Sequence, residues 1–376
     1  MDERTSRVCD TLTAAPVDLL VERLEEELRR SYGITGAELL QVDYRLSTLL
    51  PLRGGEPVSS AGHPAWHCFD HQSPALADGV GYFPVTVRGE RTGVLRVTPV
   101  PSEPELLGEL VEVARLLAHE LAAAGAGTDR YTVAARSRRL TLAAEMQWEL
   151  LPGRSRVRPS FSLAGQLEPA YAVRGDNFDW SDNGERLWLS VLNGMGEGTA
   201  ASALTTLAVN ALRNARRAGV DLADQAELAD QALYSFHRGE QHVSVLLLGV
   251  ELRTGRVTAV DAGSPRLLLL RDGEVTHQKL EAQLPLGMFD GTRYEAQHFD
   301  LRVGDRLFVV SDGVTEATAA AGRYGDAALA RFLRRTAAMA PMQAVRSILG
   351  DLRAFVGTDL VDDAVVVCLD WSGPQP

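Results

Sequence analysis

The pattern of apolar and polar residues changes twice along this chain of 376 residues. In residues 17–123, leucines at helical spacing in VDLLVERLEEELRRSYG predict an amphipathic helix that ends at Gly33. VGYFPVTVRG and TGVLRVTPV alternate like two strands, joined by a turn near Gly89. A second helix is expected over residues 103–123. The order of helix, antiparallel sheet and helix predicts an α+β module of the size of a sensor domain.

Residues 125–153 form the next piece. Gly125 and Gly127 interrupt the pattern, and residues 129–152 then read as one continuous helix that ends at Pro152. Its apolar positions are Val133, Leu140, Ala143, Met146, Leu150 and Leu151. Their spacing fits a face that packs on another helix, either the same segment of a partner chain or the following domain. We therefore expect a linker helix that supports a homodimer, with a simple linker as the alternative.

Residues 155–371 combine long apolar strands with helices. Strands are expected over 186–192, in VSVLLLGVEL and RVTAVDAG around a turn at Thr254 and Gly255, and in PRLLLLRDG, DRLFVVS and AVVVCLDW. Helices are expected over 199–218, 327–335 and 341–355. Antiparallel strands with helices between them predict two sheets sandwiched by helices. The fold class of the whole chain is therefore α+β.

Composition narrows the function. With 45% hydrophobic and 23% charged residues, the chain is typical of globular proteins. Its net charge of −12 disfavours binding to nucleic acid, and no apolar run approaches the roughly 20 residues that cross a bilayer. The start, MDERTSRVCD, lacks the apolar core of a signal peptide, and three scattered cysteines indicate no disulfide framework. We expect a cytoplasmic protein that binds neither nucleic acid nor membranes.

Four acidic motifs each follow or open an apolar run in the last piece. They are RGDNFD (174–179), LNGMGEG (192–198), SDGVTEA (311–317) and DDAVVV (362–367). A single SDG or DD is more often a turn or a strand cap than a ligand. Carboxylates brought from several strand ends to one place can, however, hold hard divalent cations. The four motifs taken together predict a metal centre, although Asn193 occupies a position where such a centre would need an acidic residue.

The order of GDxxD, NGMGxG, AGSPRLLLL, LPLGMF, SDGVTEA and DDAVVV resembles the PPM-type metal-dependent serine/threonine phosphatases. More narrowly, it resembles their bacterial SpoIIE/stress-response branch. The resemblance covers residues 155–371 and implies an αββα sandwich of two antiparallel sheets flanked by helices. QWELLP, at the end of the expected linker helix, is similar to the regulatory linker of that branch. Residues 17–123, with FPVTVRGERTGVLRV, resemble a GAF sensor domain.

The resemblance implies two Mg²⁺ or Mn²⁺ ions between the sheets and an activated water that attacks a phosphoserine or phosphothreonine. Matched motif by motif, the catalytic and metal-binding residues are Asp176 for one ion, Asp312 and Asp362 for the other, Asn193 at the bridging position and the Gly194 carbonyl as a further ligand. The resemblance gives Asp179 and Asp363 supporting places, Asp179 orienting the site and Asp363 facing away from it.

Two residues depart from the family pattern. Asn193 is neutral, and a unit charge about 4 Å from a cation is worth about 4 kcal/mol at an effective dielectric near 20. Arg174 replaces a glycine and adds positive charge, although a guanidinium can also bind substrate phosphate in a bidentate manner. Glu197 is a candidate to replace the missing carboxylate. The centre is therefore expected to be weakened at one or both ions.

Two functions follow from these residues. The first is a sensor-regulated phosphatase whose substrate, by resemblance, is a phosphorylated anti-sigma-factor antagonist. The alternative is a pseudophosphatase that binds a partner without turnover. Asp176, Asp312 and Asp362 favour the enzyme, since a scaffold has no need of them, whereas Asn193 and Arg174 favour the scaffold. We favour the enzyme.

Two further groups of residues have simpler interpretations. His63, His67, Cys68 and His71 suggest zinc, but Pro64 is expected to break the helix that would align them, which predicts a surface loop. Arg213, Arg216 and Arg217 are expected to form a solvated helix face, with a docking patch for an acidic phosphoprotein as the less favoured alternative.

Overall fold

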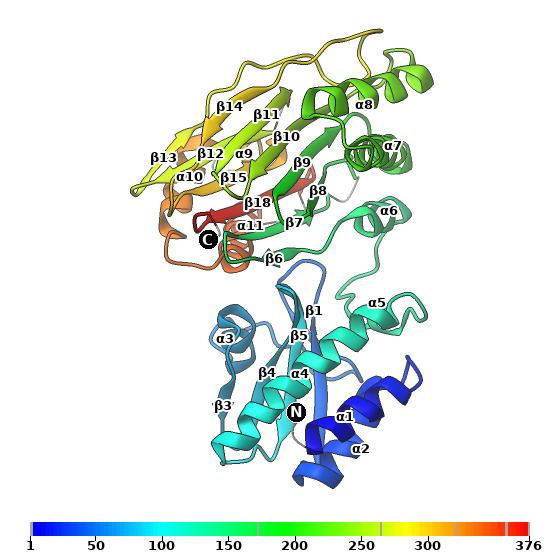
Figure 1. Cartoon of the computed structure of the whole chain (residues 1–376), viewed down its shortest axis with the longest axis vertical. Helices are drawn as coiled ribbons and strands as arrows, with labels where there is room; N and C mark the ends of the chain where they lie inside the picture. The colour runs from blue at the N-terminus through cyan, green and yellow to red at the C-terminus, as the bar shows by residue number, and fades with distance from the viewer. Residues whose placement is uncertain (1–2, 171–172, 264, 320–321, 358–359, 375–376) are drawn as a thin grey trace. The chain divides into compact units, whose positions relative to one another are not determined.

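The computed structural model describes residues 3–170, 173–263, 265–319, 322–357 and 360–374. The chain divides into two compact units, Met1–Arg139 and Leu140–Pro376, here called the N-terminal and C-terminal units (Figure 1). Strands in both units pair antiparallel, and helices pack against the sheets, so the α+β class is confirmed. No helix of the described residues is both long and apolar enough to cross a membrane.

The N-terminal unit is one antiparallel sheet with strand order β2-β1-β5-β4-β3 and helices packed on it. Its elements are α1 (Glu3–Ala14), α2 (Leu20–Tyr32), β1 (Gly36–Val42), β2 (Leu49–Pro51), α3 (Pro64–His71), β3 (Ala75–Ala77), β4 (Val80–Val87), β5 (Glu90–Thr98), α4 (Pro104–Ala124) and α5 (Arg130–Ala134). A single apolar core joins α1, α2 and α4 to one face of the sheet, with Leu24, Phe83 and Leu117 fully buried.

Local sequence explains these elements. The leucines of α2 lie on its buried side, and the helix ends where Gly33 takes a left-handed φ of 68°. Arg88 and Gly89 both have positive φ between β4 and β5, the conformation of a tight hairpin turn. The predicted amphipathic helix and the predicted hairpin are therefore confirmed. The likeness of this unit to a GAF domain stays a prediction.

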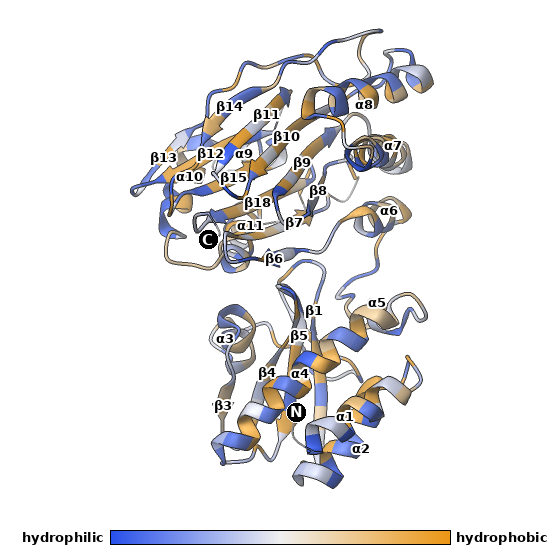
Figure 2. Ribbon diagram, in the orientation of Figure 1, coloured by the Kyte–Doolittle hydropathy of each residue, from blue (hydrophilic) through white to orange (hydrophobic). Residues whose placement is uncertain are grey.

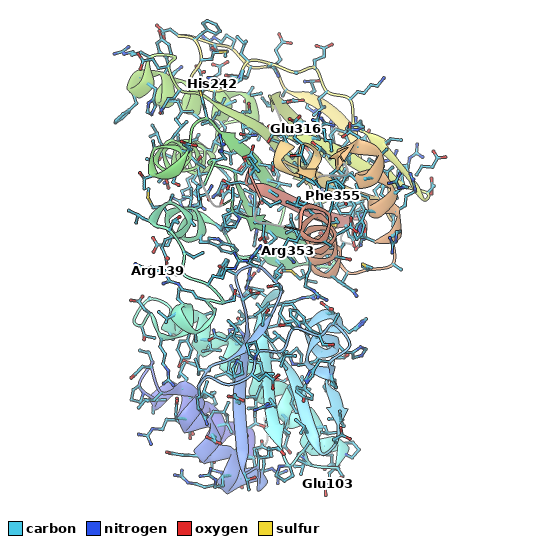
Figure 3. All side chains as sticks on the ribbon, turned by 180° about the vertical axis from the view of Figure 1, so that it is seen from behind. Glu103, Arg139, His242, Glu316, Arg353 and Phe355 are labelled. Carbon is cyan, nitrogen blue, oxygen red and sulfur yellow. The ribbon has the colours of Figure 1, made fainter. Side chains whose placement is uncertain are left out.

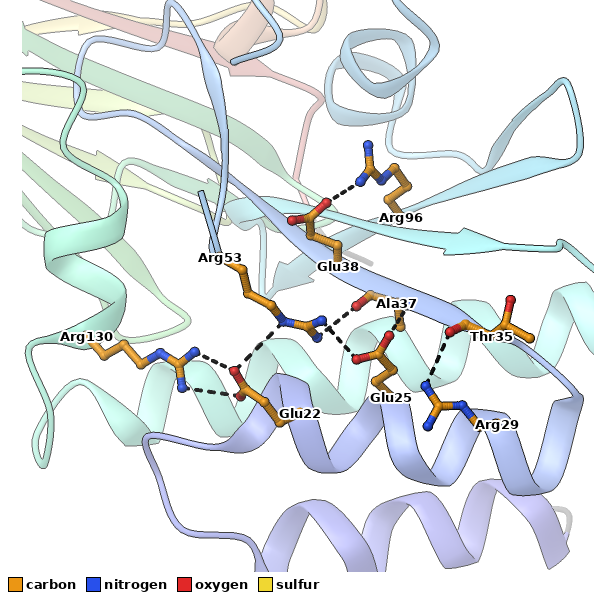
Figure 4. Close-up of polar contacts among 9 residues, drawn as sticks. All are labelled: Glu22, Glu25, Arg29, Thr35, Ala37, Glu38, Arg53, Arg96 and Arg130. Atoms are coloured by element: carbon orange, nitrogen blue, oxygen red, sulfur yellow. Dashed lines mark hydrogen bonds and ion pairs between the residues drawn. The ribbon is translucent and has the colours of Figure 1, made fainter. Parts of the chain in front are cut away.

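Ion pairs fasten the outer elements of the N-terminal unit to α2 (Figure 4). Glu22 lies 2.5 Å from Arg130 of α5 and 3.8 Å from Arg53, which follows β2. Arg53 also pairs with Glu25 at 2.9 Å. Because Arg53 and Arg130 are far apart in the sequence, these pairs hold α5 and the end of β2 against the same helix.

The interpretation of residues 63–71 as a loop was wrong. Pro64 begins α3 instead of breaking it, since proline fits the first helical position, where its missing N–H is not needed. The Nδ1 atom of His63 caps the helix by accepting from the Ala65 N–H at 3.1 Å. Trp66 and Phe69 anchor α3 by full burial, whereas His67 and His71 are exposed.

The C-terminal unit contains two stacked sheets. Its elements are α6 (Leu142–Leu150), β6 (Ser155–Val157), β7 (Phe161–Glu168), β8 (Asn177–Asp182), β9 (Arg186–Gly194), α7 (Gly198–Arg217), α8 (Leu222–His237), β10 (Val243–Glu251), β11 (Arg256–Ala262), β12 (Arg266–Arg271), β13 (Glu274–His277), β14 (Gln297–Asp300), β15 (Arg306–Val310), α9 (Asp312–Thr315), β16 (Thr318–Ala319), β17 (Gly322–Arg323), α10 (Gly325–Arg335), α11 (Pro341–Val356) and β18 (Ala364–Trp371). Sheet I has the order β14-β11-β10-β9-β8, and sheet II the order β13-β12-β15-β18-β7-β6.

Apolar residues fill the space between the two sheets. Figure 2 shows the hydrophobic stretches along their strands in orange. They include Phe178, Leu189 and Leu246 from sheet I, with Leu167, Leu307 and Val367 from sheet II. A second core joins α7 and α8 to the outer side of sheet I. On the other side, α11 packs on β7 and β18, and its Arg353 pairs with Glu168 at 2.9 Å (Figure 3). These layers confirm the predicted αββα sandwich.

The predicted continuous linker helix was wrong. Helix α5 ends at Ala134, and α6 begins at Leu142 with the Thr141 hydroxyl accepting from the Ala144 N–H at 3.2 Å. In the break, the Ser137 hydroxyl donates to Asp43 at 2.8 Å. The Thr141 hydroxyl thus caps a new helix at this point, as threonine does at helix N-termini, and Ser137 is held to Asp43 outside either helix.

The apolar positions of this segment pack mainly within the C-terminal unit. Leu140 and Ala143 contact Val173, and Leu150 joins the core under α7 and α8. The structure therefore supports the alternative in which the linker packs on the following domain. Val133, in contrast, is 56% exposed. A homodimer through the linker stays a prediction.

Candidate metal centre

Four strand ends carry the acidic motifs to one edge of the sandwich. In sheet I, β8 begins after Asp176 and β9 ends at Asn193 and Gly194. In sheet II, β15 ends just before Ser311 and Asp312, and β18 begins after Asp363. The Asn193 Nδ2 atom lies 2.5 Å from Asp312 Oδ1, so the two sheets meet at these residues.

The register of sheet I places Asp176 beside Asn193. Asn177 pairs with Leu192, and the Gly194 N–H donates to the Gly175 carbonyl at 3.2 Å. The pairing therefore continues past the end of β8, with Asp176 opposite Asn193. Directly opposite residues of an antiparallel pair share a face, with Cβ atoms about 5 Å apart. Asp176, Asn193 and Asp312 thus follow one another across the centre.

Glycines allow the backbones at the centre to approach this closely. A Cβ atom on Gly313 would lie 1.8 Å from the Asp363 carbonyl oxygen. A Cβ atom on Gly194 would lie 2.5 Å from the Thr205 hydroxyl, which itself donates to the Gly175 carbonyl at 2.6 Å. Any side chain at either glycine would push the acidic motifs apart.

Asp363 is a buried structural carboxylate. Its oxygens accept from the backbone N–H groups of Ala170, Arg174 and Gly175 at 2.8–2.9 Å, and from Gln147 Nε2 at 2.8 Å. Burial raises the pKa of Asp363, and these hydrogen bonds act against that rise. Asp363 therefore fixes the loop that presents Asp176.

Asp176 has the opposite environment. It is fully buried, and neither of its carboxylate oxygens has a hydrogen-bond partner of normal geometry among the described residues. The Ser311 hydroxyl lies near it and acts to lower the pKa of Asp176. Burial, and then the nearby carboxylate of Asp363, raise the pKa of Asp176 well above its usual range, with smaller contributions from Asp312 and Asp362. A buried carboxylate without donors is stable only with a proton or a cation.

Asp362 is half-buried between charges of both signs. Burial, and then the Asp312 carboxylate, raise the pKa of Asp362 to about 6. The Asp363 N–H, which donates to Asp362 at 2.8 Å, and the Arg174 guanidinium oppose the rise. The Nε atom of Arg174 is itself buried and has no hydrogen-bond partner among the described residues. Arg174 therefore contributes positive charge on the Asp362 side of the centre.

Two predicted site residues have other surroundings. The carboxylate of Asp179 lies 2.8 Å from both Arg213 and Arg216 of α7. These two arginines are mostly buried, so their interpretation as a solvated face was wrong: they join α7 to β8. Glu197 is exposed at the start of α7.

Sequence reasoning missed two polar residues that organise the centre. Gln147 of α6 is buried and donates to both the Asp176 carbonyl and the Asp363 carboxylate. The buried Ser311 hydroxyl accepts from the Val365 N–H at 2.9 Å and joins the ends of β15 and β18. A glutamine within an otherwise apolar helix face was the available signal for Gln147.

The donor set fits a divalent cation only in part. Within the described ranges, no three His, Cys, Asp or Glu side chains are grouped so that they could hold a metal ion by themselves. Mg²⁺, however, is commonly bound through one or two carboxylates and several waters. The two unpartnered oxygens of Asp176, beside the Gly194 backbone, fit such a cation.

Comparison with known proteins agrees with this architecture. The model of the stage II sporulation protein E (SpoIIE) family matches residues 183–372, half of the chain. The RsbU and RsbW domains of Rv1364c from Mycobacterium tuberculosis are 24% identical, with a TM-score of 0.50 over 60% of this chain and 64% of that one. The PP2C phosphatase domain and regulatory fragment of SpoIIE from Bacillus subtilis are 18% identical, with a TM-score of 0.51 over 57% of this chain and 64% of that one.

This chain thus spans less than two thirds of each of these two structures, and the likeness to them concerns the fold. It shows that the C-terminal unit has the fold of PP2C-type phosphatase domains. Since the family model covers half of the sequence, the chain belongs to the SpoIIE family of PP2C-type phosphatases.

Proposed function

We propose that the C-terminal unit is a divalent-cation-dependent phosphatase that removes phosphate from serine or threonine residues of a protein. The observation that carries this proposal is the Asp176 carboxylate, which is fully buried, has no hydrogen bond of normal geometry within the described residues and lies where the two sheets meet. A residue with only a structural role would have partners, as Asp363 has. Membership of a phosphatase family supports the same function.

The residues of the centre would have three roles: holding the cation, binding the phosphate and positioning the loops. Asp176 and the Gly194 carbonyl would hold the cation, with Asp312 and Asp362 on the facing sheet. A bound divalent cation would polarise the phosphoryl group and lower the pKa of a water molecule. Arg174 is suited to bind the substrate phosphate, because a guanidinium matches the geometry of phosphate oxygens. Asp363, Gln147 and Gly313 keep the loops in position.

We propose further that the substrate is a small phosphoprotein, an anti-sigma-factor antagonist, and that the N-terminal unit is a GAF-like sensor that controls the phosphatase. Family membership supports the substrate class, and the antiparallel sheet with helices packed on it supports the sensor. The three cysteines are free, which agrees with a cytoplasmic location.

One observation favours a second candidate, a pseudophosphatase that binds a partner without turnover. The Asn193 amide already donates to Asp312, so this acid has a partner without any metal. A centre that is satisfied in this way can keep its fold after losing catalysis.

The test is hydrolysis of a phosphoserine protein by the full chain with Mn²⁺ or Mg²⁺. The phosphatase requires turnover that Asp176→Asn reduces at least a hundredfold. The matched control is Asp261→Asn, a half-buried carboxylate of β11 that accepts from the Gly263 N–H, and it should keep the native rate. A native chain that is inert, while Asn193→Asp gains activity, would establish the pseudophosphatase.

A further inference from the structure

The two residues that depart from the family pattern act on the same side of the centre. The Asn193 amide nitrogen donates to Asp312 at 2.5 Å. The Arg174 backbone N–H donates to Asp363 at 2.8 Å, which places this cationic residue beside Asp362. Asp362 also accepts from the Asp363 N–H at 2.8 Å. Both acids of sheet II are thus partly compensated by groups of the protein itself.

The amide at position 193 has a chemical limit that a carboxylate does not have. A carboxylate offers two acceptor oxygens, so it can bridge two cations, whereas an amide offers one oxygen and one NH₂ donor. With the nitrogen of Asn193 directed at Asp312 Oδ1, the amide hydrogens occupy the position from which a cation would reach that oxygen. At most one oxygen of Asn193 is left for a metal.

Asp176 has no comparable compensation. Both of its oxygens are buried, and neither has a hydrogen bond of normal geometry within the described residues. The neutral Ser311 hydroxyl near Asp176 brings no positive charge. Its neighbours in the centre are further carboxylates, which increase the demand for positive charge. The uncompensated negative charge of the centre therefore lies on the sheet I side.

We propose that this centre holds one divalent cation, at Asp176, and that the Asn193 amide and the Arg174 guanidinium replace a second cation beside Asp312 and Asp362. The inference rests on the proposed function only in assuming that the centre binds metal. In this arrangement the substitutions at 174 and 193 belong together, because each supplies one of the two compensating groups.

The experiment measures how many Mn²⁺ ions bind to the full chain after chelation, by equilibrium dialysis with elemental analysis. The native chain should bind one ion, and Asp176→Asn none. Asn193→Asp should bind two, since it restores a bridging carboxylate and removes the amide donor. Adding Arg174→Gly to Asn193→Asp should tighten the second ion at least tenfold.

Asp312→Asn distinguishes the two sides of the centre. It should still bind one ion, because the acid that it removes faces the amide and not the cation. The control Asp261→Asn should also bind one ion, and circular dichroism would verify that each variant is folded. Two ions on the native chain, no ion at all, one ion on Asn193→Asp, or loss of the ion in Asp312→Asn would each overturn the inference.

The inference about one bound cation and the proposed phosphatase activity can each be refuted without the other. A chain that binds one ion but does not hydrolyse phosphoserine would refute the phosphatase and retain the inference. A chain that hydrolyses phosphoserine with two ions bound would do the reverse.

Discussion

Two buried aspartates of the same centre, Asp363 and Asp176, differ in their hydrogen bonds. Asp363 accepts from three backbone N–H groups at 2.8–2.9 Å and from the side chain of Gln147. Asp176, held by the loop that those bonds fix, has no hydrogen bond of normal geometry on either oxygen among the described residues. Burial raises the pKa of both carboxylates. Asp363 receives several short hydrogen bonds that oppose this rise, whereas for Asp176 the Ser311 hydroxyl offsets the rise in pKa only in part.

The difference separates a carboxylate that stabilises the fold from one that is available to a ligand. Unpaired buried groups lower stability, and they are found where a protein binds or reacts. If this distinction holds, removing Asp363 should harm folding, and removing the charge of Asp176 should harm only metal binding. Three substitutions test this difference between Asp363 and Asp176.

Asp363→Ala should have the largest effect. It leaves the N–H groups of Ala170, Arg174 and Gly175 without their acceptor, and each unsatisfied buried donor costs about 1–3 kcal/mol. Part of that cost will be relieved by water, so we expect the free energy of unfolding of the C-terminal unit to fall by about 4 kcal/mol. Urea unfolding would measure it.

The control for Asp363→Ala is Asp326→Ala. Asp326 is exposed and pairs only at the surface with Arg266, so its loss should change stability by less than about 1 kcal/mol. Equal effects of the two variants would show that Asp363 has no special structural role, and the comparison with Asp176 would then fail.

Gly313→Ala should have the next largest effect. Its Cβ atom would lie 1.8 Å from the Asp363 carbonyl oxygen, so the SDG turn and the start of β18 must separate. Overpacking of this kind costs about 1–3 kcal/mol. We expect a loss of about 3 kcal/mol in urea unfolding, together with weaker Mn²⁺ binding, because the displaced Asp363 no longer fixes the loop that presents Asp176.

Gly108→Ala is the matched control for Gly313→Ala. Gly108 lies within α4, and an added Cβ atom would meet nothing within 4 Å. Alanine should therefore stabilise the helix by up to about 1 kcal/mol. Native stability of Gly313→Ala would mean that the SDG turn and the start of β18 do not lie in contact.

Much of the fold was predictable because apolar patterning is local. The strands that end at Asn193 and Asp312 were predicted from their apolar runs, and the order of the motifs indicated that Asp176, Asp312 and Asp362 meet. Antiparallel sheets bring such strand ends to a common edge. The prediction of one continuous linker helix failed because the apolar spacing is helical throughout, whereas the helix is interrupted where the Ser137 and Thr141 hydroxyls make hydrogen bonds.

The hydrogen bonds of the centre were not predictable from the chain. Asp362 and Asp363 are adjacent in sequence, and only the structure shows that Asp363 takes its donors from residues about 190 positions earlier. The direction of the Asn193 amide depends in the same way on a residue 119 positions away. Sequence identified the residue types, but the pairing of donors with acceptors depends on tertiary packing.

Asp176→Asn should have the smallest effect on stability, and an opposite sign. The pKa of Asp176 is raised, so this acid binds its proton more tightly in the folded state than in the unfolded one. Proton binding therefore favours the folded state fully below the unfolded pKa, about 3.9, and this stabilisation is lost as pH rises toward the folded pKa. Without metal, at pH 5, the asparagine variant should therefore be about 1 kcal/mol more stable than the native chain. This advantage should grow with pH. Added Mn²⁺ should reverse it, because only the native carboxylate binds the ion.

Urea unfolding at pH 4, 5 and 7, with and without Mn²⁺, would test both signs. A variant less stable than the native chain at every pH would mean that Asp176, like Asp363, serves the fold.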